Sequence, residues 1–176
     1  TNAVHSPWGI AFNESQRLAI EADVTFYENK PDGGTNGLIA ARTIAMLSYR
    51  TYEIYEESQK DDNQVYDCFK ASSYQKYQGQ KLANRFNAYS YWILSKAMDS
   101  QNIARNRKSL VDSLSQIKSN TIVIGVSSDI LFPPSEQKFI ANHISNAKFI
   151  EIDSIFGHDG FLVELQELNT ILEHLV

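Results

Sequence analysis

Hydrophobic and polar positions alternate in two different ways along this sequence of 176 residues. From about residue 13 to residue 103, apolar side chains recur at steps of three and four, which is the spacing of amphipathic helices. From about residue 104 onward, helical spacing alternates with two short runs of mainly Val and Ile, over 121–126 and 148–152. Such runs predict parallel strands that are covered on both faces and joined by helical crossovers.

Polar breaks divide the first region into several predicted helices. Asn13 can cap a short helix that ends near Ile20, and a turn-rich segment over 29–37 follows it. A longer helix is predicted from Leu38 to about Glu57. After a polar break and an aromatic-rich stretch, a further helix is marked by an apolar stripe: Leu82, Phe86, Tyr89, Ile93 and Ala97.

The second region contains predicted helices before, between and after the two strands. The helix before the first strand is marked by Leu110, Leu114 and Ile117. The helix between the strands extends from Glu136 to Ile144, with Ser135 as its cap. The amphipathic helix at the C-terminus has an apolar stripe made of Phe161, Leu162, Leu165, Leu168, Ile171, Leu172 and Leu175.

These elements predict an α/β fold in three parts. Residues 1–34 are expected to connect from an N-terminal half of the sheet that the sequence does not contain, and residues 1–8 read as a loop entered from a strand of that half. Residues 35–103 are predicted to form an inserted helical lid. Residues 104–176 are predicted to form the C-terminal part of the core, with a parallel sheet and helix crossovers.

Composition narrows the classes of function. Hydrophobic residues make up 43% of the chain and charged residues 21%, as in ordinary soluble globular proteins. The net charge of −5 argues against binding to nucleic acid or to an anionic membrane, and no apolar stretch is long enough to span a bilayer. The single cysteine, Cys68, fits a reducing, cytoplasmic compartment, and the scattered histidines predict no metal site.

The most informative residues follow the two predicted strands. Asp129 comes directly after the first strand, and His158 comes after the second, behind Gly157. The carboxyl ends of parallel strands are where open α/β sheets place ligands and catalytic groups. A histidine can accept and return a proton near neutral pH, and an aspartate can fix its tautomer. We therefore predict a catalytic pair, the alternatives being a solvated loop acid and a structural histidine.

Strand, acid, helix, strand and histidine is the order in which the α/β-hydrolase fold supplies the last two members of a Ser–Asp–His triad. The serine should lie upstream in a Gly-x-Ser-x-Gly turn, and the sequence contains no such motif. Residues 125–128 begin like one, but Asp129 stands in place of the final Gly and two prolines follow where a helix is required. Ser127 is therefore not predicted to be the nucleophile. The sequence predicts the second half of an α/β-hydrolase enzyme, without the nucleophile.

Several stretches of the sequence resemble the homoserine O-acetyltransferase family, namely residues 10–17, 37–42, 77–91, 128–134 and 151–162. The last two, which contain Asp129 and His158, are the most specific when taken together. The resemblance spans nearly the whole chain but only the later half of the family's domain. It implies acetyl transfer from acetyl-CoA, as a co-substrate, to the hydroxyl of L-homoserine through an acyl-serine. It also implies methionine biosynthesis in the cytoplasm by a homodimer that needs no cofactor.

The resemblance further implies that Asp129 and His158 are the triad acid and base, and that Arg42 and Asp159 contact the amino-acid substrate, with Tyr49 as a further candidate. These charges suit a zwitterion, because Arg offers a fork for its carboxylate and Asp an anion for its ammonium. Arg42 and Tyr49 are two turns apart on one helix and share a face. The alternatives are a surface cation for Arg42, a lid-core aromatic for Tyr49 and a helix cap for Asp159.

Three functions remain open at this point. The first is homoserine O-acetyl transfer by a larger protein of which this chain is the later part. The second keeps the family and changes the chemistry, to a succinyl donor, a serine acceptor or ester hydrolysis. The third is a non-catalytic module whose helices, rich in aromatic residues, form a dimer interface. In each case the chain alone is predicted to be inactive, because it has a base without a nucleophile.

Overall fold

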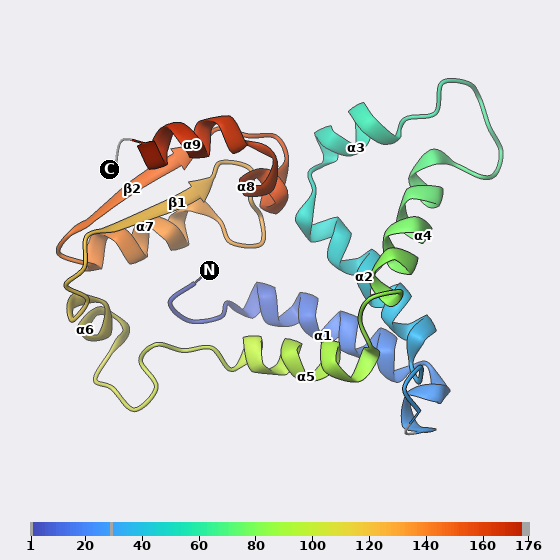
Figure 1. Ribbon diagram of the computed structural model, residues 1–176, viewed down its shortest axis with the longest axis horizontal. Coiled ribbons are helices and arrows are strands. Elements are labelled where there is room, and N and C mark those ends of the chain that lie inside the picture. Colours follow the sequence, from blue (N-terminus) through green and yellow to red (C-terminus); the bar gives the residue numbers. More distant parts are fainter. Residues whose placement is uncertain (1, 29, 174–176) are drawn as a thin grey trace. The chain divides into compact units, whose positions relative to one another are not determined.

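The computed structural model describes residues 2–28 and 30–173, and its chain forms two compact units (Figure 1). The first, here called the sheet unit, comprises Thr1–His5, Tyr49–Thr51 and Gln101–Val176. The second, here called the helical unit, comprises Ser6–Ser48 and Tyr52–Ser100. The boundaries predicted at residues 34 and 103 divide the chain by presumed role rather than by compactness, and they stay predictions.

The helical unit is built from a run of helices without a described strand. In chain order these are α1 (Pro7–Glu21), the 3-10 helix η1 (Val24–Glu28), α2 (Thr35–Tyr49), α3 (Tyr52–Gln59), α4 (Lys70–Ala83) and α5 (Ala88–Asp99). The last residue of α2, Tyr49, belongs to the sheet unit. The prediction that this region is helical is thus confirmed in kind, although several helix ends differ.

The first helix begins earlier than the sequence pattern predicted. Pro7 occupies its first turn, where the missing N–H costs nothing, and the Ser6 hydroxyl accepts a hydrogen bond of 3.1 Å from the Gly9 N–H. Asn13 therefore lies inside α1 rather than capping it, and its side chain donates to Asp99 at 2.8 Å. The expectation of a loop over residues 1–8 was wrong for its last two residues.

Two predicted helices are each divided by a short break. The helix expected from Leu38 to Glu57 is interrupted at Arg50 and Thr51, between α2 and α3. The helix marked by the stripe from Leu82 to Ala97 is interrupted over residues 84–87, where the Asn87 side chain caps α5 by accepting a hydrogen bond of 2.8 Å from the Ser90 N–H. The apolar spacing continues across both breaks, so periodicity alone could not reveal them.

The core of the helical unit has buried aliphatic members, with partly buried aromatic residues packed against them. Its buried members are Ile20, Leu38, Ala41, Leu82 and Ala88. Gly37, near the start of α2, lets that helix approach α1 closely, because an added Cβ would stand 2.6 Å from the Ile20 Cα. An alanine at this position would therefore push the two helix backbones apart.

The sheet unit holds both described strands and the helices around them. In chain order its elements are α6 (Leu110–Ser115), β1 (Thr121–Val126), α7 (Pro134–His143), β2 (Ala147–Ile152), the 3-10 helix η2 (Gly157–Asp159), α8 (Gly160–Val163) and α9 (Leu165–Glu173). The strands are parallel, with Thr121 opposite Ala147 and Val126 opposite Ile152. Both predicted strands and the helical crossover between them are confirmed.

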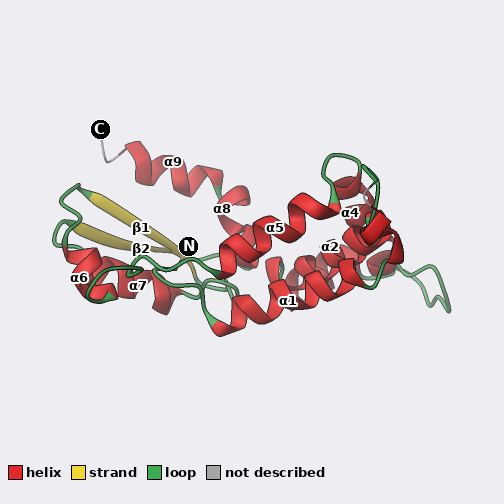
Figure 2. Cartoon of the chain, turned by 90° about the horizontal axis from the view of Figure 1, so that it is seen from below, coloured by secondary structure: helices red, strands yellow, loops and turns green. Residues whose placement is uncertain are grey.

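Helices lie on both faces of the two strands (Figure 2). Helix α7 packs on β1 and β2, and α9 lies over the opposite face. Beside α7, a small core gathers Ala3, Leu114 and Ile144. Residues 3–5 reach this core as an extended segment, in which Val4 forms an antiparallel bridge with Asn102.

Two details of the helices in this unit differ from expectation. Helix α7 begins at Pro134, and its N-cap is Pro133 without a side-chain hydrogen bond, so Ser135 lies in the first turn and is not the cap. The C-terminal helix is broken at Glu164, between α8 and α9. Leu175, the last member of the predicted stripe, and His174 lie outside the described residues.

Candidate catalytic site at the ends of the two strands

Asp129 is held by the loop that follows β1. Its backbone N–H closes a turn onto the Val126 carbonyl at 3.1 Å. Its Oδ1 accepts hydrogen bonds from the backbone N–H groups of Leu131 at 2.8 Å and Phe132 at 2.9 Å. The residue is only 7% exposed. Two fixed donors on one oxygen orient the carboxylate and leave the other oxygen to a different partner.

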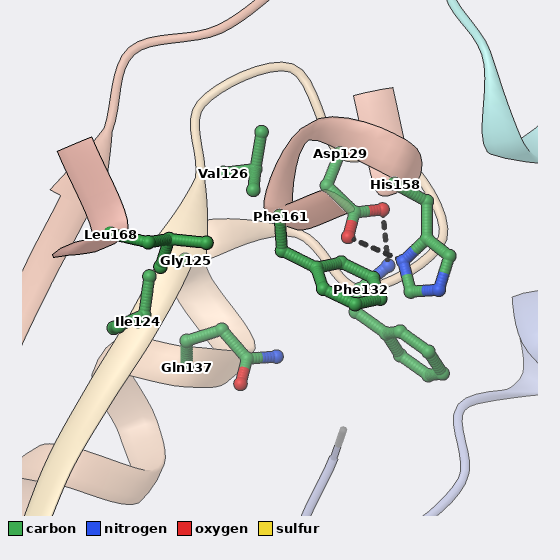
Figure 3. Close-up of a pocket in the computed structure, with 9 residues that line it drawn as sticks. All are labelled: Ile124, Gly125, Val126, Asp129, Phe132, Gln137, His158, Phe161 and Leu168. Atoms are coloured by element: carbon green, nitrogen blue, oxygen red, sulfur yellow. Dashed lines mark hydrogen bonds and ion pairs between the residues drawn. The ribbon is translucent and has the colours of Figure 1, made fainter. Parts of the chain in front are cut away.

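That partner is His158, in the loop after β2. Its Nδ1 lies 2.9 Å from Asp129 Oδ2 (Figure 3). A carboxylate can only accept, so the hydrogen bond places the proton on Nδ1 and leaves the lone pair on Nε2. The imidazole is more exposed than its partner, with 22% of the side chain accessible against 7% for the aspartate. This is the arrangement of a general base whose tautomer is fixed by a carboxylate hydrogen-bonded to its other ring nitrogen.

Gly157 makes the turn that delivers the histidine. Its φ is +66°, in the region that favours glycine. The loop also passes close to the end of α2, because a Cβ on Gly157 would stand 2.9 Å from the carbonyl oxygen of Tyr49. Both features require a residue without a side chain immediately before His158.

Serine hydroxyls join the loop after β1 to the loop after β2. Ser128 Oγ donates to the Ser154 carbonyl and accepts a hydrogen bond of 2.9 Å from the Gly157 N–H. Ser127 Oγ donates to Asp153 Oδ1 at 2.9 Å and accepts from the Ser154 N–H at 3.1 Å. These bonds hold the two loops together, and so fix the distance between Asp129 and His158. The Ser127 hydroxyl is engaged here rather than beside the imidazole.

Aromatic rings surround the imidazole of His158. The ring centroids of Phe132, Tyr49 and Phe161 lie 5.1, 5.4 and 5.7 Å from its own. Phe132 and Phe161 present edges, while Tyr49 is tilted by 48°. Tyr49, predicted as a further candidate for substrate contact, has its ring against the imidazole of His158. These rings restrict the rotation of the imidazole and keep water from part of its surface.

The two residues after Tyr49 bind the loop that carries His158. Arg50 Nε donates to Asp159 Oδ2 at 2.9 Å, and the Thr51 hydroxyl donates to the Ile155 carbonyl. Asp159 has no side-chain hydrogen bond to α8, so its carboxylate pairs with a guanidinium and does not cap the helix. Sequence reasoning missed Arg50, which is separated from Asp159 by 109 positions. The sole available signal was its place directly after a candidate residue.

Arg42, the other predicted substrate contact, lies on α2 in the helical unit and is half-buried. The contacts of the sheet unit described above bring together Asp129, His158, Tyr49 and Asp159. Arg42 is not among them, and its role stays a prediction. Cys68 is exposed.

A cavity of about 420 Å³ opens beside the pair, within the sheet unit. Its lining is mostly apolar and consists of Ile124, Gly125, Val126, Asp129, Phe132, Gln137, His158, Phe161 and Leu168 (Figure 3). Among the residues that the structure describes, no group of three or more His, Cys, Asp or Glu could hold a metal ion. Likewise, none of the described helices is both long and apolar enough to cross a membrane.

Several known proteins with similar sequences are named homoserine O-acetyltransferase. A homoserine O-acetyltransferase from Cyclobacterium marinum is 50% identical to this chain over 173 residues, which are 98% of the chain and 49% of the relative. One from Chloroherpeton thalassium is 38% identical and is matched over 96% of the chain and 45% of its own length. No protein-family model matches the chain. The chain thus spans about half the length of the curated relatives it matches.

Solved structures with a similar fold include a homoserine O-acetyltransferase and an esterase. A homoserine O-acetyltransferase from Staphylococcus aureus superposes with a TM-score of 0.77 at 26% identity, covering 99% of this chain and 48% of that one. Esterase E22, as an L374D mutant, gives a TM-score of 0.81 at 16% identity, with 94% and 49% covered, and shows the fold alone. The prediction of a partial α/β-hydrolase fold is therefore confirmed. By its sequence, the chain is similar, over nearly its whole length, to about half the length of proteins named homoserine O-acetyltransferase.

Proposed function

We propose that this chain carries the general base, its orienting acid and part of the acceptor site of a homoserine O-acetyltransferase. The observation that carries the proposal is the 2.9 Å hydrogen bond between His158 Nδ1 and Asp129 Oδ2, at adjacent ends of two parallel strands. The nucleophilic serine is expected in a part of the protein outside this sequence.

His158 would move a proton twice in each catalytic cycle. Its Nε2 would first take the proton of the serine hydroxyl as that oxygen attacks the acetyl thioester, and then give the proton to the departing CoA sulfur. In the second half-reaction it would take the proton of the homoserine hydroxyl as that oxygen attacks the acyl-serine, and return it to the serine oxygen. Asp129, fixed by the N–H groups of Leu131 and Phe132, would stabilise the imidazolium in both halves.

Asp159 would contact the ammonium of the acceptor, because it lies directly after the base in the sequence and keeps 16% of its side chain accessible. Arg42 would contact the carboxylate, as the resemblance implies. Tyr49, with its ring 5.4 Å from that of His158, would form an apolar wall close to the reacting atoms. These assignments give one group to each charge of the zwitterion.

The wider setting is proposed from the family alone. Acetyl-CoA is the proposed donor, without a cofactor, and methionine biosynthesis in the cytoplasm is the proposed process. Exposed aromatic residues of the helical unit, such as Tyr27 at 69% and Tyr89 at 64%, support a proposed homodimer through its helices. The chain alone is proposed to lack turnover, since its sequence holds no nucleophile elbow.

The test uses the full-length protein that contains this chain. Release of CoA is followed with a thiol reagent, with acetyl-CoA or succinyl-CoA as donor and with homoserine, serine or water as acceptor, and the product is identified by mass. We expect O-acetylhomoserine from acetyl-CoA and homoserine. The separately purified 176-residue chain is the matched control and should release no CoA above the blank rate.

Other outcomes have clear meanings. A preference for succinyl-CoA or for serine would keep the base and its acid but replace the donor or the acceptor. CoA release that does not depend on any acceptor would indicate hydrolysis. Turnover by the isolated chain at the rate of the full-length protein would contradict the placement of the nucleophile outside this sequence.

A further inference from the structure

The ion pair between Arg50 and Asp159 lies one residue away from the proposed base. The two side chains meet at 2.9 Å through Arg50 Nε and Asp159 Oδ2, and they are 25% and 16% exposed. Among the described residues, Asp159 is the one acceptor that the Arg50 guanidinium binds, and only Nε takes part. The N–H groups on its two terminal nitrogens therefore remain for another acceptor.

This pair is fixed in place by the residues on either side of it. The tilted ring of Tyr49 packs against His158, and Thr51 donates to the Ile155 carbonyl. Thus Tyr49, the last residue of α2, and the two residues that follow it, Arg50 and Thr51, each contact the loop that carries His158. A guanidinium anchored in this way cannot move far when a ligand approaches Asp159.

An anchored guanidinium changes what Asp159 can bind. Under the proposed function Asp159 contacts the ammonium of the acceptor, but an ammonium that approaches this carboxylate also approaches the positive charge of Arg50. For a simple amino alcohol the repulsion offsets much of the attraction. An α-amino acid brings a carboxylate with its ammonium, and that carboxylate can accept from the terminal N–H groups of Arg50.

We propose that Arg50 is a specificity-determining residue, which makes the acceptor site select zwitterionic hydroxy amino acids over amino alcohols. The proposal rests on the proposed function, because it concerns the acceptor of the same reaction. It does not require Arg42 to be absent from the site. It adds a second cation whose position is set by Asp159 itself.

A purely supporting role for Arg50 predicts a different behaviour. If the guanidinium only held Asp159 and the loop of His158 in place, its loss would slow transfer to every acceptor by the same factor. If the guanidinium binds the acceptor's carboxylate, its loss would slow transfer to homoserine more than transfer to an acceptor without that group. The ratio of kcat/KM for the two acceptors therefore distinguishes a supporting role from a role in acceptor binding.

The experiment measures acetyl transfer by the full-length protein to L-homoserine and to 3-aminopropan-1-ol, which is homoserine without its carboxylate. For each acceptor kcat/KM is determined in the wild type and in Arg50→Gln, Arg50→Lys and Arg107→Gln. In Arg50→Gln we expect the ratio of kcat/KM for homoserine to that for 3-aminopropan-1-ol to fall by about tenfold or more. Arg50→Lys, which keeps the charge without the fork, should retain part of the ratio.

Arg107→Gln is the matched control, because it removes the same charge from an exposed position in the sheet unit. It should leave the ratio unchanged. Formation of the acyl-enzyme, measured as a burst of CoA without acceptor, should persist in both Arg50 variants and shows that the active site is intact.

A parallel loss for both acceptors in Arg50→Gln would overturn the proposal and leave Arg50 a supporting residue. Should Arg50→Gln fail to fold, the wild-type ratio and that of Arg50→Lys decide: a wild type that uses both acceptors equally well overturns the proposal. A full-length protein that acetylates neither acceptor would instead refute the proposed function, which is a separate result.

Discussion

The two units of this molecule treat their buried charges in opposite ways. In the helical unit Arg17 is 4% exposed and is bound by Glu14, Asp99 and Ser95. The carboxylates of Glu14 and Asp99 form ion pairs with its guanidinium, and the cluster ties α1 to α5. In the sheet unit the buried Asp129 is paired with His158, whose imidazole can accept and return a proton.

The two units also differ in how deeply their apolar residues are buried. Ile20, Leu38 and Ala41, in the helical unit, have relative exposures of 0%, 1% and 0%. In β1 the first four residues are only half-buried, although strands of a parallel sheet are ordinarily covered on both faces. The helical unit therefore has an enclosed core of its own. The sheet unit concentrates its fixed contacts at the strand ends, where the proposed chemistry takes place.

The largest effect should come from breaking the pair in the sheet unit. In the full-length protein, His158→Ala and Asp129→Asn should each lower kcat on the order of 10⁴-fold, because either change removes the base or its orienting partner. Acetyl transfer to homoserine measures the loss, and circular dichroism should show an unchanged fold. Retention of more than about a tenth of the activity by either variant would mean that the residue has another role.

The next largest effect should come from breaking the charge cluster of the helical unit. Arg17→Met should lower the free energy of unfolding by about 3 kcal/mol, because it leaves Asp99 partly buried without its guanidinium. Urea unfolding of the chain can be followed by tryptophan fluorescence, since both tryptophans, Trp8 and Trp92, belong to this unit. The exposed pair of Lys30 with Glu28 offers the control, with side chains 64% and 44% accessible.

Lys30→Met should change the free energy of unfolding by less than about 1 kcal/mol, because an exposed ion pair is weak. Equal losses in Arg17→Met and Lys30→Met would show that the Arg17 cluster is no more than a surface feature. The contrast between the buried charges of the two units would then not hold for the helical unit.

The sequence predicted the parts of this molecule that depend on local pattern. The runs of Val and Ile gave the strands, and the residues at their ends gave Asp129 and His158, because parallel strands deliver such residues to one edge. The breaks at residues 50–51 and 164 could not be predicted, since apolar spacing continues through them. The first is accompanied by distant contacts, such as that of Thr51 with Ile155, which spacing along the chain does not encode.

The same limit applies to the site. Arg50 was missed because its partner is 109 positions away, and an arginine at a helix end is ordinarily a solvated cation. Asp159 was identified but its local alternative, a helix cap, was wrong, because the guanidinium competes for the carboxylate. Charged side chains are thus placed by tertiary contacts, whereas strand ends are placed by pattern.

A smaller effect should follow from Gly157→Ala. The residue has a φ of +66°, and a Cβ there would stand 2.9 Å from the Tyr49 carbonyl oxygen. Alanine should destabilise the sheet unit by about 1–2 kcal/mol and displace the imidazole that follows it. Hydrogen exchange of the amides in β1 and β2 measures the first effect, and transfer activity of the full-length protein measures the second.

Gly157→Asn separates the two causes of this strain. Asparagine tolerates a positive φ better than alanine does but brings the same Cβ. If the backbone conformation dominates, the asparagine variant should be the more stable of the two. If the clash with Tyr49 dominates, both should be destabilised alike, and wild-type stability in both would mean that the loop adapts freely.

The smallest effect concerns Asp23, a carboxylate of the helical unit whose pKa is lowered in the folded state. The hydroxyl of Thr25, followed by backbone N–H groups of Gly37, Thr25 and Asn36, lowers the pKa of Asp23 below its ordinary value despite partial burial. Its Oδ1 accepts from Thr25 Oγ1 at 2.7 Å, and its Oδ2 accepts from the Gly37 N–H at 3.1 Å, within the first turn of α2. A carboxylate at this end of a helix is stabilising.

Because the folded-state pKa of Asp23 lies below the unfolded one, its contribution is fully present above the unfolded pKa, about 4. The contribution is lost as the pH falls through the folded pKa. Asp23→Asn should therefore cost about 1 kcal/mol at pH 7, and the difference from wild type should shrink as the pH is lowered below about 4. Urea unfolding followed by tryptophan fluorescence measures it, with Asp32→Asn as an exposed control in the same connection. A cost for Asp23→Asn that stays constant from pH 7 to pH 3 would show that the shape of the side chain, and not its charge, stabilises the start of α2.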